Sequence, residues 1–381
     1  MLRRLTLGFA GVLAAAVSIV ACSSSDATQT ISVGPNFPPQ TLYAADVTQN
    51  AINIYSPNPK STAGPQYQIG GGSTTLSGPQ YLTFDSNNDL FVTNWVQSSD
   101  SGSLLEFQAL ATGNVLPYQT YIYSGVRPRG IASTPFTFAA GSSAGNLLAV
   151  AVTDPSQPSG YQSLIELFEA NALSIVYETI GGPGTGINVA SGLAFDAKSN
   201  LYVANLQGKS VEVFAIAPTP SPTPSTSPTA SPTVTPSPTP TPVGATPTPV
   251  PTTTPLALTP TATISGAATE LGEPTGIAVD SSTNIYVADQ ASTVCAPACP
   301  AILIFAAGSN GNVAPKAIAG SNTLLAAPTD VKVDPSGNIY VADTAAGSGV
   351  VYVYSKGSTG NVAPSATLKS PGALVGIGLV P

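Results

Sequence analysis

The chain has 381 residues, of which only 8% are charged and 7% aromatic, whereas 36 are glycine and 37 are proline. This composition favours strands and turns over amphipathic helices. The chain contains no histidine, which excludes Ser-His-Asp triads, Cys-His dyads, histidine-ligated zinc and imidazole acid–base catalysis.

The first 22 residues have the pattern of an export signal. A basic start precedes an apolar stretch that is too short for a typical membrane span and ends at Cys22 in the sequence IVAC. This ending resembles the lipobox of bacterial lipoproteins, although an ordinary secretory signal with a chance cysteine is the alternative. We therefore expect a signal peptide over 1–21, lipidation of Cys22, a flexible tether over 22–39 and an extracytoplasmic location. Ser23 favours the outer membrane or the cell surface over the inner membrane, by resemblance to known sorting preferences.

The expected mature chain is acidic. Removal of the signal leaves nine lysines and arginines against 19 aspartates and glutamates. Such a surface repels nucleic acid and anionic lipid headgroups. We therefore expect no nucleic-acid partner, and membrane association only through the N-terminal lipid. We also expect a monomer with a protein or glycan partner in the cell envelope.

A ten-residue phrase recurs along the chain. It reads DPSGNIYVAD at 334–343, and its clearest other copies are DSSTNIYVAD (280–289), DAKSNLYVAN (196–205) and DSNNDLFVTN (85–94). Around each copy the sequence predicts four strands separated by turns, with a period of roughly 50 residues. The strands are apolar at consecutive positions, so both faces of each sheet must be covered. These features predict the blades of a β-propeller.

The second strand of each predicted blade can be counted. The six copies lie at 42–46, 90–94, 147–153, 201–205, 285–289 and 339–343. The first copy has no preceding inner strand, whereas 373–381 is a strand without a partner. We therefore predict an all-β fold, a six-bladed propeller over 40–381, closed by pairing of the C-terminal strand with the N-terminal blade.

The repeated phrase resembles the NHL-repeat family of six-bladed propellers. The matching residues are PTGIAVD at 274–280 and GNIYVAD at 337–343, and the resemblance covers nearly all of 40–381 outside one insert. It implies the propeller fold, and it implies no single activity because members of the family differ widely in function.

A Pro/Thr/Ser-rich insert at 217–260 carries no charge and cannot form a core. We expect it to be extended or disordered. The flanking sequences read as the third and fourth strands of one blade, which places the insert within blade four. A spacer, a glycan-bearing stalk, a wall contact and a neutral expansion all remain open.

Two cysteines remain in the expected mature fold, Cys295 and Cys299. Outside the cytoplasm a local disulfide is the expected state of such a pair. A metal site would need more soft ligands than this spacing supplies, so no metal site is predicted.

Polar residues are expected at the propeller face that carries the connections between blades. Ends of the second strands place Asn94, Asn205, Asp289 and Asp343 there, together with Asp46 and Asp154. The preceding connections bring Gln80, Arg129, Ser191, Thr275 and Thr329 to the central mouth. Capping of local loops is the alternative role for the strand-end residues.

Three residues of this face break the repeat. Arg127 and Arg129 stand where other blades carry small or neutral residues, and Trp95 directly follows a second strand. These three, with Gln80 and the four strand-end residues Asn94, Asn205, Asp289 and Asp343, are the candidate ligand contacts.

Three functions remain open from the sequence. The favoured one is a lipid-anchored, non-catalytic binding or scaffold module, with no catalytic residues and no cofactor. The second is a hydrolase or lyase that resembles gluconolactonase and uses a divalent cation, for which Glu273 would be one ligand. The third is an envelope structural protein that acts through the Pro-rich arm.

Overall fold

The computed structural model describes residues 37–56, 64–96, 101–137, 144–157, 162–173, 176–216, 258–344 and 348–381. The predicted signal peptide, Cys22 and most of the tether lie outside these residues, as does the Pro-rich insert apart from 258–260. In the described part of the chain, no helix has both the length and the apolar character needed to cross a membrane.

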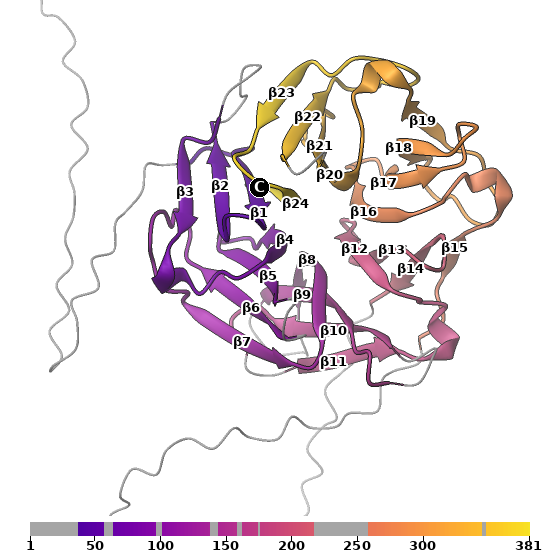
Figure 1. The fold of residues 1–381 in the computed structure, drawn as a ribbon. Coiled ribbons are helices and arrows are strands. Elements are labelled where there is room, and N and C mark those ends of the chain that lie inside the picture. Colours follow the sequence, from indigo (N-terminus) through magenta and orange to yellow (C-terminus); the bar gives the residue numbers. More distant parts are fainter. Residues whose placement is uncertain are drawn as a thin grey trace, which may run out of the picture.

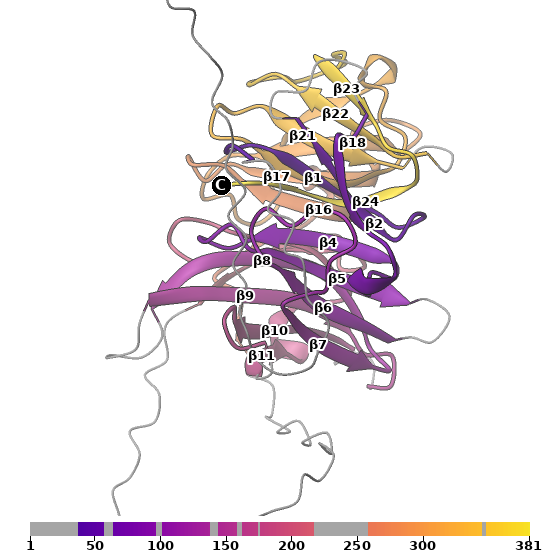
Figure 2. The same cartoon turned by 90° about the vertical axis from the view of Figure 1, so that its left-hand side faces the viewer.

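Six antiparallel sheets of four strands surround a central axis (Figure 1), and the ring is seen from its side in Figure 2. Blade one contains β24 (Leu374–Leu379), β1 (Leu42–Asp46), β2 (Ala51–Tyr55) and β3 (Tyr67–Gly70). Blade two contains β4 (Pro79–Phe84), β5 (Leu90–Val96), β6 (Ser101–Phe107) and β7 (Gln119–Ser124). Blade three contains β8 (Arg127–Thr137), β9 (Ala144–Thr153), β10 (Ser163–Glu169) and β11 (Val176–Gly181).

The other three blades follow in chain order. Blade four contains β12 (Ala190–Phe195), β13 (Asn200–Asn205), β14 (Ser210–Ala215) and β15 (Ala262–Ile264). Blade five contains β16 (Pro274–Val279), β17 (Ile285–Ser292), β18 (Cys299–Phe305) and β19 (Lys316–Ala319). Blade six contains β20 (Pro328–Val333), β21 (Ile339–Asp343), β22 (Val350–Tyr354) and β23 (Ala366–Lys369). The predicted six-bladed propeller is confirmed.

The ring is closed by the two ends of the described chain. β24 pairs with β1 in an antiparallel register that places Leu42 opposite Leu379, and Figure 1 shows the C-terminus beside these strands. The buried carboxylate of Asp46 reinforces the closure, because its Oδ2 accepts hydrogen bonds from the Gly372 amide at 2.9 Å and the Ser370 hydroxyl at 3.0 Å. The predicted pairing is confirmed, and it removes an exposed inner edge from the first sheet.

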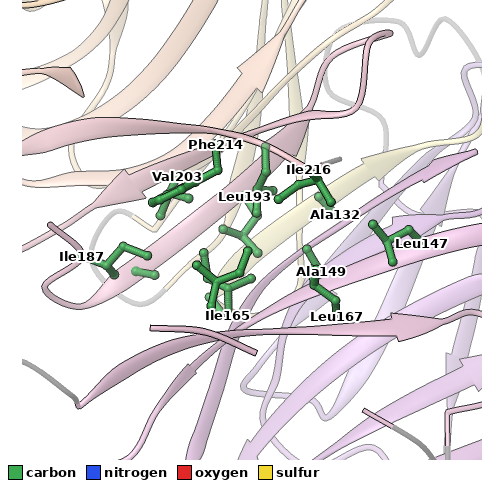
Figure 3. Close-up of a cluster of buried hydrophobic side chains, with 14 residues drawn as sticks. Ala132, Leu147, Ala149, Ile165, Leu167, Ile187, Leu193, Val203, Phe214 and Ile216 are labelled. Atoms are coloured by element: carbon green, nitrogen blue, oxygen red, sulfur yellow. The ribbon is translucent and has the colours of Figure 1, made fainter. Parts of the chain in front are cut away.

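One buried apolar cluster fills the space between each pair of neighbouring blades. The cluster between blades three and four (Figure 3) joins side chains of both sheets, among them Leu147, Ala149, Ile165, Leu167, Leu193, Val203 and Phe214. Because each sheet lies between two clusters, both of its faces are covered. This is the physical reason for the consecutive apolar residues in the strands.

The carboxylate that opens the repeated phrase organises a turn. In blade five, Asp280 Oδ1 accepts from the main-chain amides of Ser282 and Asn284, both at 2.9 Å, and its Oδ2 accepts from Asn284 Nδ2 at 2.8 Å. Asp196 and Asp334 make the same two contacts with the asparagine four residues onward. The phrase recurs because every copy builds the same turn between the first two strands of a blade.

Four short 3₁₀ helices connect one blade to the next. They are η1 (Gly72–Thr74), η2 (Pro183–Thr185), η3 (Ala267–Thr269) and η4 (Ser321–Thr323). The residue before each is a glycine whose φ lies between 93° and 116°, a region open to glycine and strained for other residues. The last threonine of each helix donates to the carbonyl of that glycine at 2.7 Å.

Blade four contains a long interruption between adjacent strands. β14 and β15 pair with Val211 opposite Ile264, and Ile216 and Leu258 both pack against the cluster between blades three and four. The chain therefore leaves and re-enters the fold at neighbouring points of one sheet.

A disulfide joins Cys295, in the connection between β17 and β18, to Cys299, the first residue of β18, with their Cα atoms 5.6 Å apart. The predicted bond is confirmed.

Candidate functional site

A cavity of about 580 Å³ opens on the axis at the end of the ring where the innermost strands begin. This volume lies in the range of small-molecule sites. Each blade contributes to its wall, through residues of the innermost strands and of nearby connections: Gln80, Tyr81, Arg129, Ser191, Leu206, Gln207, Lys209, Gly272, Glu273, Thr275, Gln290, Thr329 and Val375. All five residues expected at the central mouth lie in this wall, including the two ligand candidates Gln80 and Arg129.

The hydroxyl of Tyr81 lies in the floor of the cavity and links four blades. Its oxygen is 3.3 Å from Ser191 Oγ, 3.2 Å from the Thr329 carbonyl and 3.4 Å from the Thr275 carbonyl. The ring is 5% exposed, and burial raises the pKa of Tyr81 above its usual range. The phenol therefore stays protonated and closes the centre of the ring.

The sequence interpretation did not include Tyr81, although the repeat contains a signal for it. At the corresponding inner-strand position four other blades have glycine, at Gly130, Gly192, Gly276 and Gly376. These glycines allow close approach between neighbouring inner strands, since a Cβ on Gly130 would lie 2.0 Å from the Ser191 carbonyl oxygen. A tyrosine at one of the six positions therefore places a large side chain at the axis.

Arg129 is the innermost cation of the wall. Burial lowers the pKa of its guanidinium, and the neighbouring Arg127 lowers it further. Its Nε is buried without a hydrogen-bond partner, and its Cζ lies 5.7 Å from the ring centroid of Trp95. Arg127 lies at 5.6 Å from the same ring. Both guanidinium groups therefore lie against the Trp95 ring, and neither Trp95 nor Arg127 lines the cavity.

The four strand-end candidates, Asn94, Asn205, Asp289 and Asp343, lie outside the cavity wall. Their side chains are buried against the connections between blades. Asp289 accepts from the amides of Gly272 and Glu273 at 2.8 and 3.0 Å, and Asp343 accepts from consecutive amides of the next connection at 2.9 and 3.1 Å. Burial is the largest cause of a raised pKa at both carboxyls. These contacts correspond to loop capping, the alternative role considered above.

The two asparagines of this set behave in the same way. Asn205 donates to the Gly186 carbonyl at 2.8 Å and accepts from the Asn188 amide at 2.7 Å, whereas Asn94 donates to Ser103 Oγ at 3.0 Å. None of the four strand-end side chains lines the cavity. Their effect on the site is indirect, since they fix the connections that form its wall.

The charged groups at the opening are few. Lys209 and Glu273 are exposed at the rim, and Glu273 is the single carboxylate of the cavity wall. Among the described residues, no three Asp, Glu, Cys or His side chains form a group that could hold a metal ion.

Comparison with known proteins supports the fold alone. No family model and no curated protein matches the chain. A protein of unknown function from Bacteroides caccae is similar in structure, with a TM-score of 0.53 and 11% sequence identity, over 90% of this chain and 99% of that one. A luciferin-regenerating enzyme has a TM-score of 0.47 and 13% identity over 89% of this chain and 95% of its own. A streptogramin B lyase has a TM-score of 0.43 and 10% identity over 86% of each chain.

Proposed function

We propose that this protein is an NHL-like, lipid-anchored binding module outside the cytoplasm, and that the axial cavity is its site for an envelope glycan. The cavity carries the proposal, because side chains of all six blades meet around one small-molecule-sized space. The Cys295–Cys299 disulfide is consistent with an oxidising compartment. The anchor follows from the sequence around Cys22.

The chemistry of the wall favours binding over catalysis. Most of its polar groups are amides and hydroxyls, which form hydrogen bonds and do not exchange protons near neutral pH. The titratable groups are a buried phenol with a raised pKa, two cations and one rim carboxylate. A pair of acid and base positioned for proton transfer is not found among these wall residues.

A glycan array tests the binding function. The purified mature chain is expected to bind a restricted set of glycans, and Gln207→Trp, which places a large ring in the cavity wall, is expected to abolish that binding. Thr359→Trp is the control, because Thr359 is exposed in the turn between β22 and β23 at the other end of the ring. Equal binding by both variants, or selective capture of an envelope protein with no glycan bound, would contradict the proposal.

The anchor has a separate test. In a bacterial host fed radioactive palmitate, the full chain is expected to incorporate label and to fractionate with membranes, whereas Cys22→Ala is expected to do neither. Label on the Cys22→Ala chain would show that the anchor is elsewhere. The hypothesis of an envelope role for the Pro-rich arm concerns residues outside those described, and it stays a prediction.

A further inference from the structure

Arg129 is the one cation among six equivalent wall positions. The other blades place Gln80, Ser191, Thr275, Thr329 and Val375 at the start of their innermost strands. Since the mature chain carries a strong excess of acidic residues, a guanidinium at the axis is a specific feature of this surface. It points to recognition of a negative charge.

The guanidinium of Arg129 is partly buried and has no anionic partner among the described residues. Its Nε is buried and has no hydrogen-bond partner, and one side of it is covered by Trp95. No carboxylate of the described residues forms an ion pair with it. The Nη groups of Arg129 have no hydrogen-bond partner among the described residues and are not fully buried, so a ligand carboxylate in the cavity can accept from them.

Several other wall groups present acceptors. The Thr275 hydroxyl donates to the Pro328 carbonyl at 2.9 Å, and Gln80 Nε2 donates to the Gly78 carbonyl at 2.9 Å. Gln290 Nε2 donates to the Pro328 carbonyl in the same way at 3.2 Å. The Thr275 hydroxyl proton is therefore engaged by the backbone, and each glutamine keeps its Oε1 acceptor and one further N–H donor for a ligand. A ligand rich in hydroxyl groups supplies the matching donors.

We propose that the cavity binds a carbohydrate that carries a carboxylate, with the carboxylate at Arg129 and the sugar hydroxyls at the acceptors of Thr275, Gln80 and Gln290. The inference rests on the proposed glycan-binding function and specifies its ligand as an acidic sugar, of which a hexuronic acid residue is the simplest example. Lys209 at the rim adds a second positive charge along the path of entry.

Calorimetric titration with hexuronic acid disaccharides and their methyl esters tests this proposal. The ester keeps the shape and the hydroxyls and removes the charge. The mature chain is expected to bind the best free acid roughly 10- to 100-fold more tightly than its ester, which is the contribution of one charge-assisted hydrogen-bond pair. Arg129→Gln is expected to remove this preference, whereas Arg129→Lys is expected to retain part of it.

Lys316→Gln is the matched control, because it removes one positive charge from the exposed outer strand β19 of blade five and is expected to keep the full preference. Thermal unfolding establishes that each variant is folded, and Arg129→Lys carries the test if Arg129→Gln is not. Equal affinity for acid and ester overturns the acidic-sugar inference, as does failure to bind any acid. A neutral glycan found on the array would in that case leave the proposed binding function standing.

Discussion

A buried carboxyl between blades two and three predicts an unusual dependence of stability on pH. Glu166 lies on β10, its Oε2 is buried without a hydrogen-bond partner of good geometry, and the phenols of Tyr121 and Tyr123 on β7 are its neighbours. Burial raises the pKa of Glu166 from 4.5 to about 7, and the nearby Tyr123 hydroxyl offsets this in part. Between about pH 4.5 and pH 7 the folded protein therefore holds a proton that the unfolded chain has largely released.

The sign and size of the effect follow from linkage. Below about pH 4.5 both states are protonated and the full stability is present. As the pH rises towards 7, only the unfolded chain ionises, so the free energy of unfolding falls. A pKa difference of this size corresponds to about 3 kcal/mol. Glu106, whose pKa burial also raises to about 7, adds a decline of the same sign.

The test is urea denaturation of wild type and Glu166→Gln at several pH values between 4.5 and 7.5 at fixed ionic strength. The variant is expected to lose about 3 kcal/mol less than wild type across this range and to keep the decline due to Glu106. Glu169→Gln, on the same strand, controls for the change in net charge. A Glu166→Gln profile as steep as that of wild type would refute the reasoning.

Three further predictions concern the stability of the propeller. Leu374→Ala, at a fully buried position of the closing strand β24, is expected to lower the free energy of unfolding by about 2–5 kcal/mol in urea denaturation, and a loss below about 1 kcal/mol would contradict a structural closure. Gly130→Ala is expected to cost about 1–3 kcal/mol or more, because its Cβ would lie 2.0 Å from a carbonyl oxygen of blade four. In Gly64→Ala the added Cβ would have no heavy atom within 4 Å apart from those of the adjacent residues. The free energy of unfolding of this variant is expected to stay within about 0.5 kcal/mol of that of wild type. Replacing Cys295 and Cys299 by serine is expected to cost at most about 2 kcal/mol, because the closed loop is short, and thermal unfolding of oxidised and reduced protein checks this value.

The blades and their closure could be predicted because the same local signals are repeated in nearly every blade. Each copy of the repeated phrase supplies its own turn carboxylate, as at Asp280 and Asp334, and the apolar strands require cover on both faces. The predicted strand at 373–381 had no partner, and the first blade alone lacked an inner strand, so pairing of the two was the expected closure. The residues at the start of the innermost strands, such as Gln80 and Arg129, follow from the same register, so their meeting at the axis was also predictable.

The direction of the strand-end side chains could not be predicted in this way. The repeat places Asp289 and Asp343 at strand ends on the side of the ring that holds the cavity. At such a position a carboxylate can face the axis, or it can accept hydrogen bonds from amides of the neighbouring connection. The outcome depends on the conformation of the loop, which brings two amides within 3.1 Å of each carboxylate. Gln207, in the loop between β13 and β14, reaches the cavity wall for the same reason.

Because one sheet holds both the first described strand and the last, synthesis and assembly of this protein are separated in time. Among the described strands β1, β2 and β3 are synthesised first, yet the inner edge of β1 pairs with β24, the last of these strands. A chain that stops before β24 contains five whole blades and one incomplete blade. Such a truncated copy exposes the inner edge of β1, and the ring closes only after β24 has been synthesised.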